Sequence, residues 1–429
     1  MRKFLWVLCT GSAVLGVLAA TYCFSGHQPA RQERGRDRPV QALYVWQQAW
    51  NDDVRQSLAQ AANVAQRIMV LAREDRMPPL NVDWKAVADT GLDTTLVFRY
   101  PSALGEEFRG DPVKARERVA GEILAACRDA TAQGVRVEGI QLDYDAPTAS
   151  LPEYARFLQG LAPLLPSEWA LSITALPTWL AESAFADLVG GLDYYVLQVH
   201  SFERPGSIET PLVLCDTARI PGYVKRAERL GVPYFIAFPT HGYEAAFNAA
   251  GAFIGLSAEG PDAAWPPGSQ LREVRADPGT IAEAVKALRA DPPAHFLGVV
   301  WFRMPVATDT RNWTWPVLAA VMSGRIPSVE FHAEVRHPEP GLAEIWLASV
   351  GEDRPRIAVD VEVGVPVEAI LASDFVNGFQ PFPSPQDSGV ILRGKAPVGQ
   401  EPIMIGWYRM KDETAALAIN ITGTEGPGR

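Results

Sequence analysis

Two aspartates separated by one residue, Asp143 and Asp145, offer the clearest acid–base chemistry in the sequence. They close the stretch Val137–Asp145, which begins as a short apolar run and ends in carboxylates, as a buried parallel strand does where it opens into a site. Side chains alternate along a strand, so Gln141, Asp143 and Asp145 share one face, with the aspartate Cα atoms roughly 6.6 Å apart. At that range two carboxylates can couple their proton affinities and take separate acid and base roles.

A simpler interpretation gives these residues local structural roles. Asp143 would cap the following helix, and Asp145 would start the turn Asp145-Ala146-Pro147. Caps are common for a single aspartate. Three polar residues that point the same way from a buried strand are harder to explain as caps, because buried charge is costly unless it is used or paired. The set therefore favours a functional site.

The elements that would position these residues form a repeating pattern from residue 41 onwards. Short apolar runs alternate with helix-like segments, and eight strands each followed by a helix are typical of a (β/α)8 TIM barrel. A doubly wound open sheet is the competing fold, but its glycine-rich phosphate turn is missing after the first strand. The expected strands are Ala42–Trp46, Gln66–Ala72, Thr94–Arg99, Val137–Leu142, Ala170–Ala175, Leu192–Val199, Pro233–Phe238 and Phe296–Phe302.

Polar or aromatic residues end all eight expected strands, at the barrel face where catalytic groups gather. An isolated polar residue at a strand end, such as His200, is more often a hydrogen-bonded residue of the barrel wall than a catalytic acid or base. A purely structural barrel does not need polar ends on every strand, so the pattern indicates a binding site. The candidate substrate-binding residues are Trp46, Glu74, Arg99, Gln141, Tyr194, Gln198, His200, Trp301 and Arg303.

Two further segments depart from a simple barrel. The stretch from Pro239 to Asp277 is too long for an ordinary strand-to-helix connection. It is either an excursion over the barrel mouth that walls or gates the cleft, or a disordered surface insertion. Residues 41–325 would form the barrel, and in residues 326–429 short strands separated by Gly, Pro and Asp turns predict a β-sandwich. That domain could bind carbohydrate, but without a clear exposed aromatic platform we expect it to brace the barrel.

The N-terminus has the features of a targeting segment. Arg2 and Lys3 precede an apolar run from Phe4 to Phe24, which suits a signal peptide or a membrane anchor over residues 1–26. Residues 27–40 would be a linker. We expect an exported protein that is periplasmic, anchored in the inner membrane facing the periplasm, or secreted. The sequence leaves cleavage and anchoring as open alternatives.

Composition narrows the possible partners. The chain has 429 residues, 48% of them hydrophobic, which is enough for a large core, and this length predicts two domains. Its net charge of −11 argues against nucleic acid and anionic membrane surfaces as main partners. Without a CxxC pair or a His-rich cluster, we expect no metal and no cofactor. A disulfide between Cys127 and Cys215 is possible but not indicated.

The stretch Glu138–Asp145 resembles the strand signature of the family 18 glycoside hydrolases, the chitinase-like barrels, which reads Asp-Gly-x-Asp-x-Asp-x-Glu. Gly298–Trp301 resembles the same family's strand end, where the Trp floors the sugar site, and Tyr194–His200 is placed like its sixth strand. The chain departs from the signature at Glu138, Gln141 and Asp145, and only Asp143 is unchanged. Replacing the terminal Glu by Asp withdraws the acid by roughly 1.5 Å. Compared with the family 18 enzymes, this chain would then have a narrower cleft, act on a different substrate, or have lost the activity.

More of the chain resembles an uncharacterised family of exported bacterial proteins, the domain of unknown function family 3142. The resemblance covers Leu43–Gln47, Gly139–Leu158, Leu171–Leu180, Asp193–Phe202 and Pro233–Tyr243. Membership implies a glycosidase-like barrel and leaves the activity unassigned.

Two functions follow from these resemblances. In the first, the chain is a glycoside hydrolase for an envelope or extracellular polysaccharide, with Asp145 as general acid beside ionised Asp143. Trp46 and Trp301 would stack on sugars, Arg99, Gln198, His200 and Arg303 would bind hydroxyls or an acidic group, and Glu74 could add a carboxylate across the barrel. In the second, the barrel binds a glycan or a protein and cleaves nothing.

Overall fold

The computed structural model describes residues 39–75, 77–78, 80–200, 204–257, 264–355, 357–365, 367–384, 389–397, 401–412 and 417–425. The expected signal peptide or anchor over 1–26 and nearly all of the expected linker over 27–40 lie outside these residues. Within the described part of the chain, no helix combines the length and the apolarity needed to cross a membrane.

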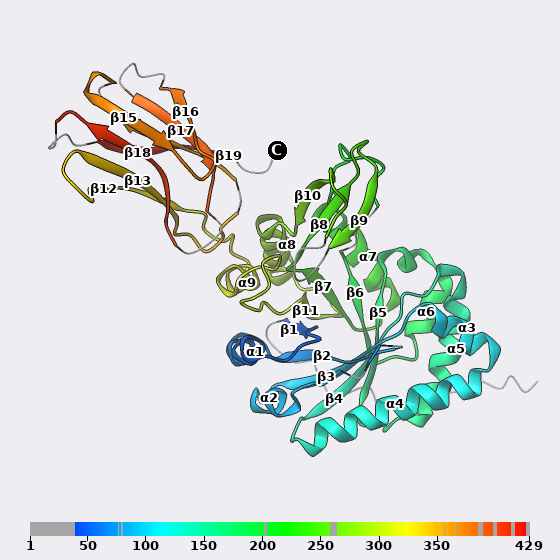
Figure 1. The fold of residues 1–429 in the computed structure, drawn as a ribbon. Helices are drawn as coiled ribbons and strands as arrows, with labels where there is room; N and C mark the ends of the chain where they lie inside the picture. The colour runs from blue at the N-terminus through cyan, green and yellow to red at the C-terminus, as the bar shows by residue number, and fades with distance from the viewer. Residues whose placement is uncertain are drawn as a thin grey trace, which may run out of the picture.

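Eight parallel strands close into a barrel in the order β1-β11-β7-β6-β5-β4-β3-β2, which confirms the predicted TIM-barrel fold (Figure 1). Each strand has a predicted counterpart whose bounds differ by at most two residues. The strands are β1 (Val40–Val45), β2 (Arg67–Glu74), β3 (Asp93–Arg99), β4 (Val137–Asp143), β5 (Ala170–Ala175), β6 (Tyr194–Gln198), β7 (Tyr234–Pro239) and β11 (Phe296–Phe302).

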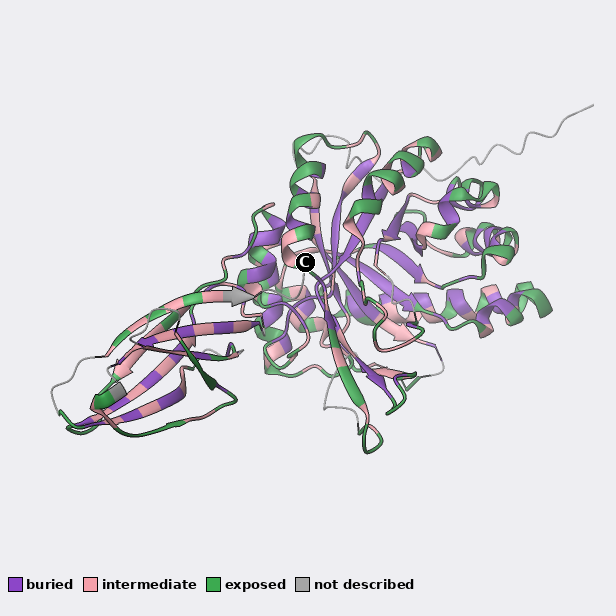
Figure 2. Cartoon of the chain, turned by 90° about the horizontal axis from the view of Figure 1, so that it is seen from above, coloured by how far each residue is buried: buried purple, intermediate pink, exposed green. Residues whose placement is uncertain are grey.

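Helices surround the barrel, with their exposed outer faces turned to solvent and the strands buried inside (Figure 2). Several begin at a side-chain cap. The Asp111 carboxylate, for example, accepts from the backbone N–H of Lys114 at the start of α4. The helices are α1 (Asp52–Val64), α2 (Trp84–Asp89), α3 (Ala103–Gly110), α4 (Pro112–Ala132), α5 (Leu151–Leu161), α6 (Ser183–Val189), α7 (Ile220–Leu230), α8 (Pro278–Ala290) and α9 (Trp315–Met322).

Alternation along the strands divides the barrel into two packing layers. Tyr44, Val97 and Phe235 belong to the cluster inside the barrel. Leu43 and Trp301, which are register partners on β1 and β11, belong to the larger cluster between the strands and the helices. The choice of layer decides which side chains can reach the barrel mouth, the end formed by the C-terminal ends of the strands.

The segment after β7 folds into a three-stranded antiparallel sheet of order β10-β8-β9, formed by β8 (Gly242–Phe247), β9 (Phe253–Ser257) and β10 (Gln270–Arg275). It rises from the end of β7 (Figure 1). Arg272 ties this sheet to the loop after β6, because its Nη1 donates to the carbonyl oxygen of Thr210 at 2.8 Å. The described part of the excursion is therefore ordered, and it forms a wall at the β7 edge of the mouth.

Two four-stranded antiparallel sheets make up the C-terminal sandwich, in the orders β12-β13-β18-β15 and β16-β17-β14-β19. A separate apolar core lies between them. Arg275 of β10 joins the two domains through an ion pair with Asp353 at 2.7 Å. The strands are β12 (Phe331–Arg336), β13 (Leu342–Ser349), β14 (Ala358–Gly364), β15 (Ile370–Phe375), β16 (Gln380–Pro383), β17 (Gly389–Lys395), β18 (Ile403–Met410) and β19 (Ala418–Glu425).

Candidate functional site

Asp143 is the last residue of β4 and points into the barrel mouth. Its side chain is only 12% exposed. Its Oδ1 accepts a hydrogen bond of 2.7 Å from Thr174 Oγ1 on the neighbouring strand β5. Gln141, two residues earlier, is fully buried inside the barrel. The alternation predicted for this strand is therefore present, and it places one carboxyl at the base of the mouth.

Charged side chains from β2 and β3 surround this carboxyl. Arg99 Nε lies 3.7 Å from Asp143 Oδ2, and Arg99 Nη1 lies 3.4 Å from Glu74 Oε1. Burial raises the pKa of Asp143 to about 6, with further increases from Asp145 and Glu74, against the hydrogen bond from Thr174 and the charge of Arg99. Desolvation is the dominant cause, so Asp143 exchanges a proton near neutral pH.

Asp145 lies just beyond the end of the strand and is exposed to solvent. Burial nonetheless raises the pKa of its carboxyl, and the charge of Arg99 opposes this shift. The charge of Asp145 also contributes to the rise in the pKa of Asp143, after burial and the hydrogen bond from Thr174.

The layer below Asp143 is polar but closed. The Tyr44 hydroxyl donates to Gln141 Oε1 at 2.6 Å, and the Tyr194 hydroxyl lies 3.4 Å from Thr95 Oγ1. Gln141 is 0% exposed and Tyr194 only 4%. The prediction that these two residues contact substrate is corrected by the structure, because both are buried beneath the mouth, where they shape the floor under Asp143.

The opposite side of the mouth carries two histidines and a phenylalanine, which we call the histidine wall (His200, His241 and Phe302). His200 stacks on Phe302 with ring centroids 5.4 Å apart, and His241 meets the same ring edge-on at 5.3 Å. Burial lowers the pKa of His200 to about 4 and that of His241 to about 3, and His200 lowers the latter further. Both imidazoles are therefore neutral at neutral pH. Gln198, half-buried at the end of β6, shares the parity of Tyr194 and Val196, which face the barrel interior.

Trp46 links the two sides of the mouth. Its ring lies edge-on to Phe302 at 5.2 Å, and the Arg99 guanidinium carbon lies 5.9 Å from its ring centroid. The residue is half-buried, so part of the indole faces solvent. An indole held in this way offers a rigid apolar surface beside the carboxyls.

Two predicted site residues point elsewhere. Trp301 is fully buried in the helix-facing layer, where its Nε1 donates to Gln41 Oε1 at 2.7 Å. The prediction that it stacks on a sugar is wrong, because the side chains of β11 that face the mouth have the opposite parity and end in Phe302. Arg303 is 4% exposed, and its Nε donates to Asp309 at 3.2 Å, so this guanidinium is buried in an ion pair instead of open to substrate.

The sequence-based list of site residues omitted four residues that build the mouth. Thr174 and Tyr44 could have been found from strand alternation, because residues two apart on a strand share a face. Thr174 lies two residues after Ser172, and Tyr44 lies two residues before Trp46. Phe302 was omitted because the prediction assigned the mouth-facing position to Trp301, and neighbouring residues on a strand point to opposite faces. His241 lies beyond the end of β7, where strand parity gives no guidance.

Among the described residues, no group of three or more His, Cys, Asp or Glu side chains is placed to hold a metal ion. Cys127 and Cys215 are both free thiols. Among the described residues, the mouth is lined by the carboxyls, Arg99, the two imidazoles and the aromatic rings.

Residues 111–307 match the family described as Domain of unknown function (DUF3142). The match spans α4 to β11 and includes both sides of the mouth except Tyr44, Trp46, Glu74 and Arg99. It confirms the family resemblance inferred from the sequence over this range. No curated protein matches the chain.

Several solved structures are similar in fold. The spore cortex-lytic enzyme SleL of Bacillus cereus is 12% identical, with 67% of this chain and 74% of that chain covered and a TM-score of 0.49. A GH18 chitinase from Cycas revoluta in complex with (GlcNAc)4 is 12% identical, with 66% of this chain and 98% of that chain covered and a TM-score of 0.46. A family GH18 chitinase from Chromobacterium violaceum is 9% identical, with 90% of this chain and 91% of that chain covered and a TM-score of 0.43. At these scores the similarity does not extend to function.

Proposed function

We propose that the protein is a glycoside hydrolase that cleaves an envelope or extracellular polysaccharide at the barrel mouth. The observation that carries the proposal is the paired carboxyl site at the end of β4. Asp143 is buried and has its pKa raised to about 6, and exposed Asp145 lies next to it. Burial raises the pKa of both carboxyls, and glycosidases draw a proton donor and a group that stabilises the developing positive charge from such a pair.

Asp145 is the general acid in this proposal. Its exposure at the strand end lets it reach a glycosidic oxygen above the mouth, and burial raises the pKa of its carboxyl, which favours the protonated form that a general acid needs. Asp143, held by Thr174 at 2.7 Å, stabilises the positive charge that develops on the sugar. Trp46 supplies the surface against which the sugar ring packs.

The test is hydrolysis by purified protein that comprises residues 39–429. The substrates are soluble tetrasaccharides of N-acetylglucosamine and of glucose, insoluble chitin and peptidoglycan sacculi. Asp145→Asn should lower the rate by about 10²–10⁴-fold while sugar binding persists. Asp129→Asn serves as the matched control, because Asp129 is an exposed aspartate of α4 near the face opposite the mouth. Product anomers read by NMR would give retention or inversion.

A non-catalytic glycan-binding barrel is the second candidate function. It is favoured by the contacts of Asp143, whose carboxyl accepts from Thr174 and lies 3.7 Å from Arg99, as a purely structural carboxylate would. In that case no substrate is turned over, and Asp145→Asn binds sugar as the wild type does. Loss of hydrolysis with binding kept supports the enzyme instead.

A further inference from the structure

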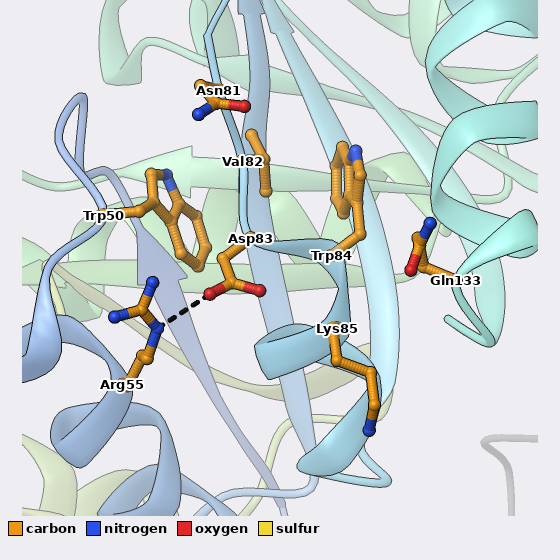
Figure 3. A pocket seen from close by; sticks show the side chains of 8 residues that line it. All are labelled: Trp50, Arg55, Asn81, Val82, Asp83, Trp84, Lys85 and Gln133. Atoms are coloured by element: carbon orange, nitrogen blue, oxygen red, sulfur yellow. Dashed lines mark hydrogen bonds and ion pairs between the residues drawn. The ribbon is translucent and has the colours of Figure 1, made fainter.

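A pocket on the flank of the barrel lies outside the candidate site. It has a volume of about 320 Å³ and lies beside α1 and α2. Trp50 comes from the loop after β1, and Trp84 begins α2. Their indoles lie on either side of Asp83 (Figure 3). The volume falls at the lower end of the roughly 300–1,000 Å³ range of small-molecule pockets, so the pocket suits a short ligand segment.

The two indoles are held firmly and remain partly open. Trp50 and Trp84 are each half-buried and pack against the main core between strands and helices. Such anchoring fixes ring orientation before a ligand arrives, which lowers the entropy cost of binding. Tryptophan offers a large apolar face with few rotatable bonds, and the C–H faces of sugar rings pack on such surfaces.

The polar groups between the indoles form a charge-balanced floor. Arg55 Nε donates to Asp83 Oδ2 at 2.8 Å, and Asp83 Oδ1 also accepts from the backbone N–H of Ala86. Lys85 pairs with Asp89 one turn further along α2. Each cation that lines the pocket is matched by a carboxylate, so the floor does not select for an anion such as phosphate. The exposed side chain of Asn81 adds an uncharged amide that can donate to and accept from hydroxyl groups.

We propose that this flank pocket binds a neutral sugar segment, as a second carbohydrate site separate from the mouth. The proposal rests on the proposed function, because its ligand is the polysaccharide that the mouth cleaves. Trp46 at the mouth and Trp50 in the pocket belong to the same short loop, and Gln48 between them donates to Glu74 at 3.4 Å. A polymer held at the flank is thereby kept beside the carboxyl pair, which raises its effective concentration there.

The test measures retention on insoluble chitin and on peptidoglycan sacculi by pelleting, in the Asp145→Asn background so that hydrolysis does not release the protein. Trp84→Ala should weaken retention about fivefold, and Trp84→Phe should restore most of it because an aromatic face remains. Asn81→Ala, which removes an exposed side chain without touching the core, should weaken it about twofold. Trp346→Ala, which removes a half-buried tryptophan from the sandwich, is the matched control.

The outcomes separate this inference from the proposed function. Retention that falls in Trp84→Ala and Asn81→Ala, but not in Trp346→Ala, supports the flank site even if the wild type hydrolyses nothing. Three results would overturn the flank site, even if the mouth proves catalytic. All variants could be retained equally, Trp346→Ala could lose as much retention as Trp84→Ala, or the Asp145→Asn parent could be retained on neither polymer. Thermal unfolding of each variant excludes global destabilisation as the cause of lost retention.

Discussion

The two sides of the barrel mouth respond to burial in opposite ways. On one side is the carboxylate wall, which we define as Glu74, Asp143 and Asp145. On the other is the histidine wall. Burial raises the pKa of Asp143 to about 6 and lowers that of His200 to about 4 and that of His241 to about 3. The same loss of hydration favours the neutral form of both acid and base.

What distinguishes the walls is their connection to solvent and to other charges. Asp143 has exposed Asp145 and half-exposed Arg99 next to it, so its proton can be exchanged and its charge can be matched. His241 is 1% exposed, and its Nδ1 lies 3.1 Å from the carbonyl oxygen of Phe302. In the proposed mechanism, acid–base work therefore belongs to the carboxylate wall, and the histidine wall provides shape and hydrogen bonding.

The sharpest way to break this comparison is to neutralise one residue on each wall. Asp143→Asn should lower kcat by about 10²–10³-fold, because the carboxyl that stabilises charge in the transition state is lost. His200→Gln keeps a hydrogen-bonding side chain and removes a neutral imidazole, so kcat should fall by less than about tenfold. Initial rates on soluble tetrasaccharides provide the measurement. A larger loss in His200→Gln than in Asp143→Asn would reverse the roles of the walls.

The pH dependence of stability should also have opposite signs on the two walls. The folded protein binds the Asp143 proton more tightly than the unfolded chain, because the pKa rises from 3.8 to about 6. This residue therefore adds stability as the pH falls from 6 towards 4. The pKa of His241 falls from 6.5 to about 3, so the unfolded chain takes up that proton first. Its contribution is lost as the pH falls below 6.5.

Urea unfolding at pH 7.0 and pH 4.5 measures this difference. Relative to wild type, His241→Gln should become more stable on acidification by on the order of 2 kcal/mol, because the protonation penalty is gone. Asp143→Asn should become less stable on acidification by a similar amount. Both variants can lose stability at pH 7.0, so only the change between the two pH values is diagnostic. Changes of the same sign in both would contradict opposite effects of burial.

A smaller effect is expected at Arg99, which opposes the rise in the pKa of both aspartates. Arg99→Met keeps the length of the side chain and removes the charge. The acidic limb of the pH–rate profile should then move to higher pH by up to about one unit, since a neighbouring cation no longer favours the charged carboxylates. High salt should shift the wild type in the same direction, because half-exposed Arg99 is screened. An unmoved limb would show that Arg99 does not act on the catalytic pair.

Local signals explain which parts of this arrangement are predictable from sequence. The eight apolar runs and the helices between them define the barrel, because strands buried on both faces read as continuous hydrophobic segments. The direction of the Asp143 side chain follows from strand alternation, because β4 (Val137–Asp143) is a continuous strand up to that residue. The short strand β16 (Gln380–Pro383) could not be predicted from such signals, because its two prolines are typical of non-strand or edge segments.

Side-chain direction on β11 could not be predicted in the same way. Trp301 faces the helices because it is the register partner of Leu43 on β1, and a register between strands about 260 residues apart is set by tertiary packing. The burial of Gln141 and Tyr194 depends likewise on how closely the barrel interior fills. The two aspartates of the carboxylate wall come from one continuous stretch of sequence at the end of β4, whereas the histidine wall is assembled from three strand ends. For this reason the aspartates were both identified, and the histidine wall only in part.

The two tryptophans predicted to stack on sugar provide the finest test of this distinction. Trp46→Phe keeps a smaller ring beside Arg99, so KM should rise only about two- to fivefold with kcat little changed. Trp301→Phe removes a hydrogen bond to Gln41 and some core volume, so it should cost about 1–2 kcal/mol of stability with KM unchanged. Steady-state kinetics and urea unfolding of both variants give the four values. A KM effect in Trp301→Phe with none in Trp46→Phe would mean that substrate approaches β11 from the helix-facing layer, which a closed barrel does not allow.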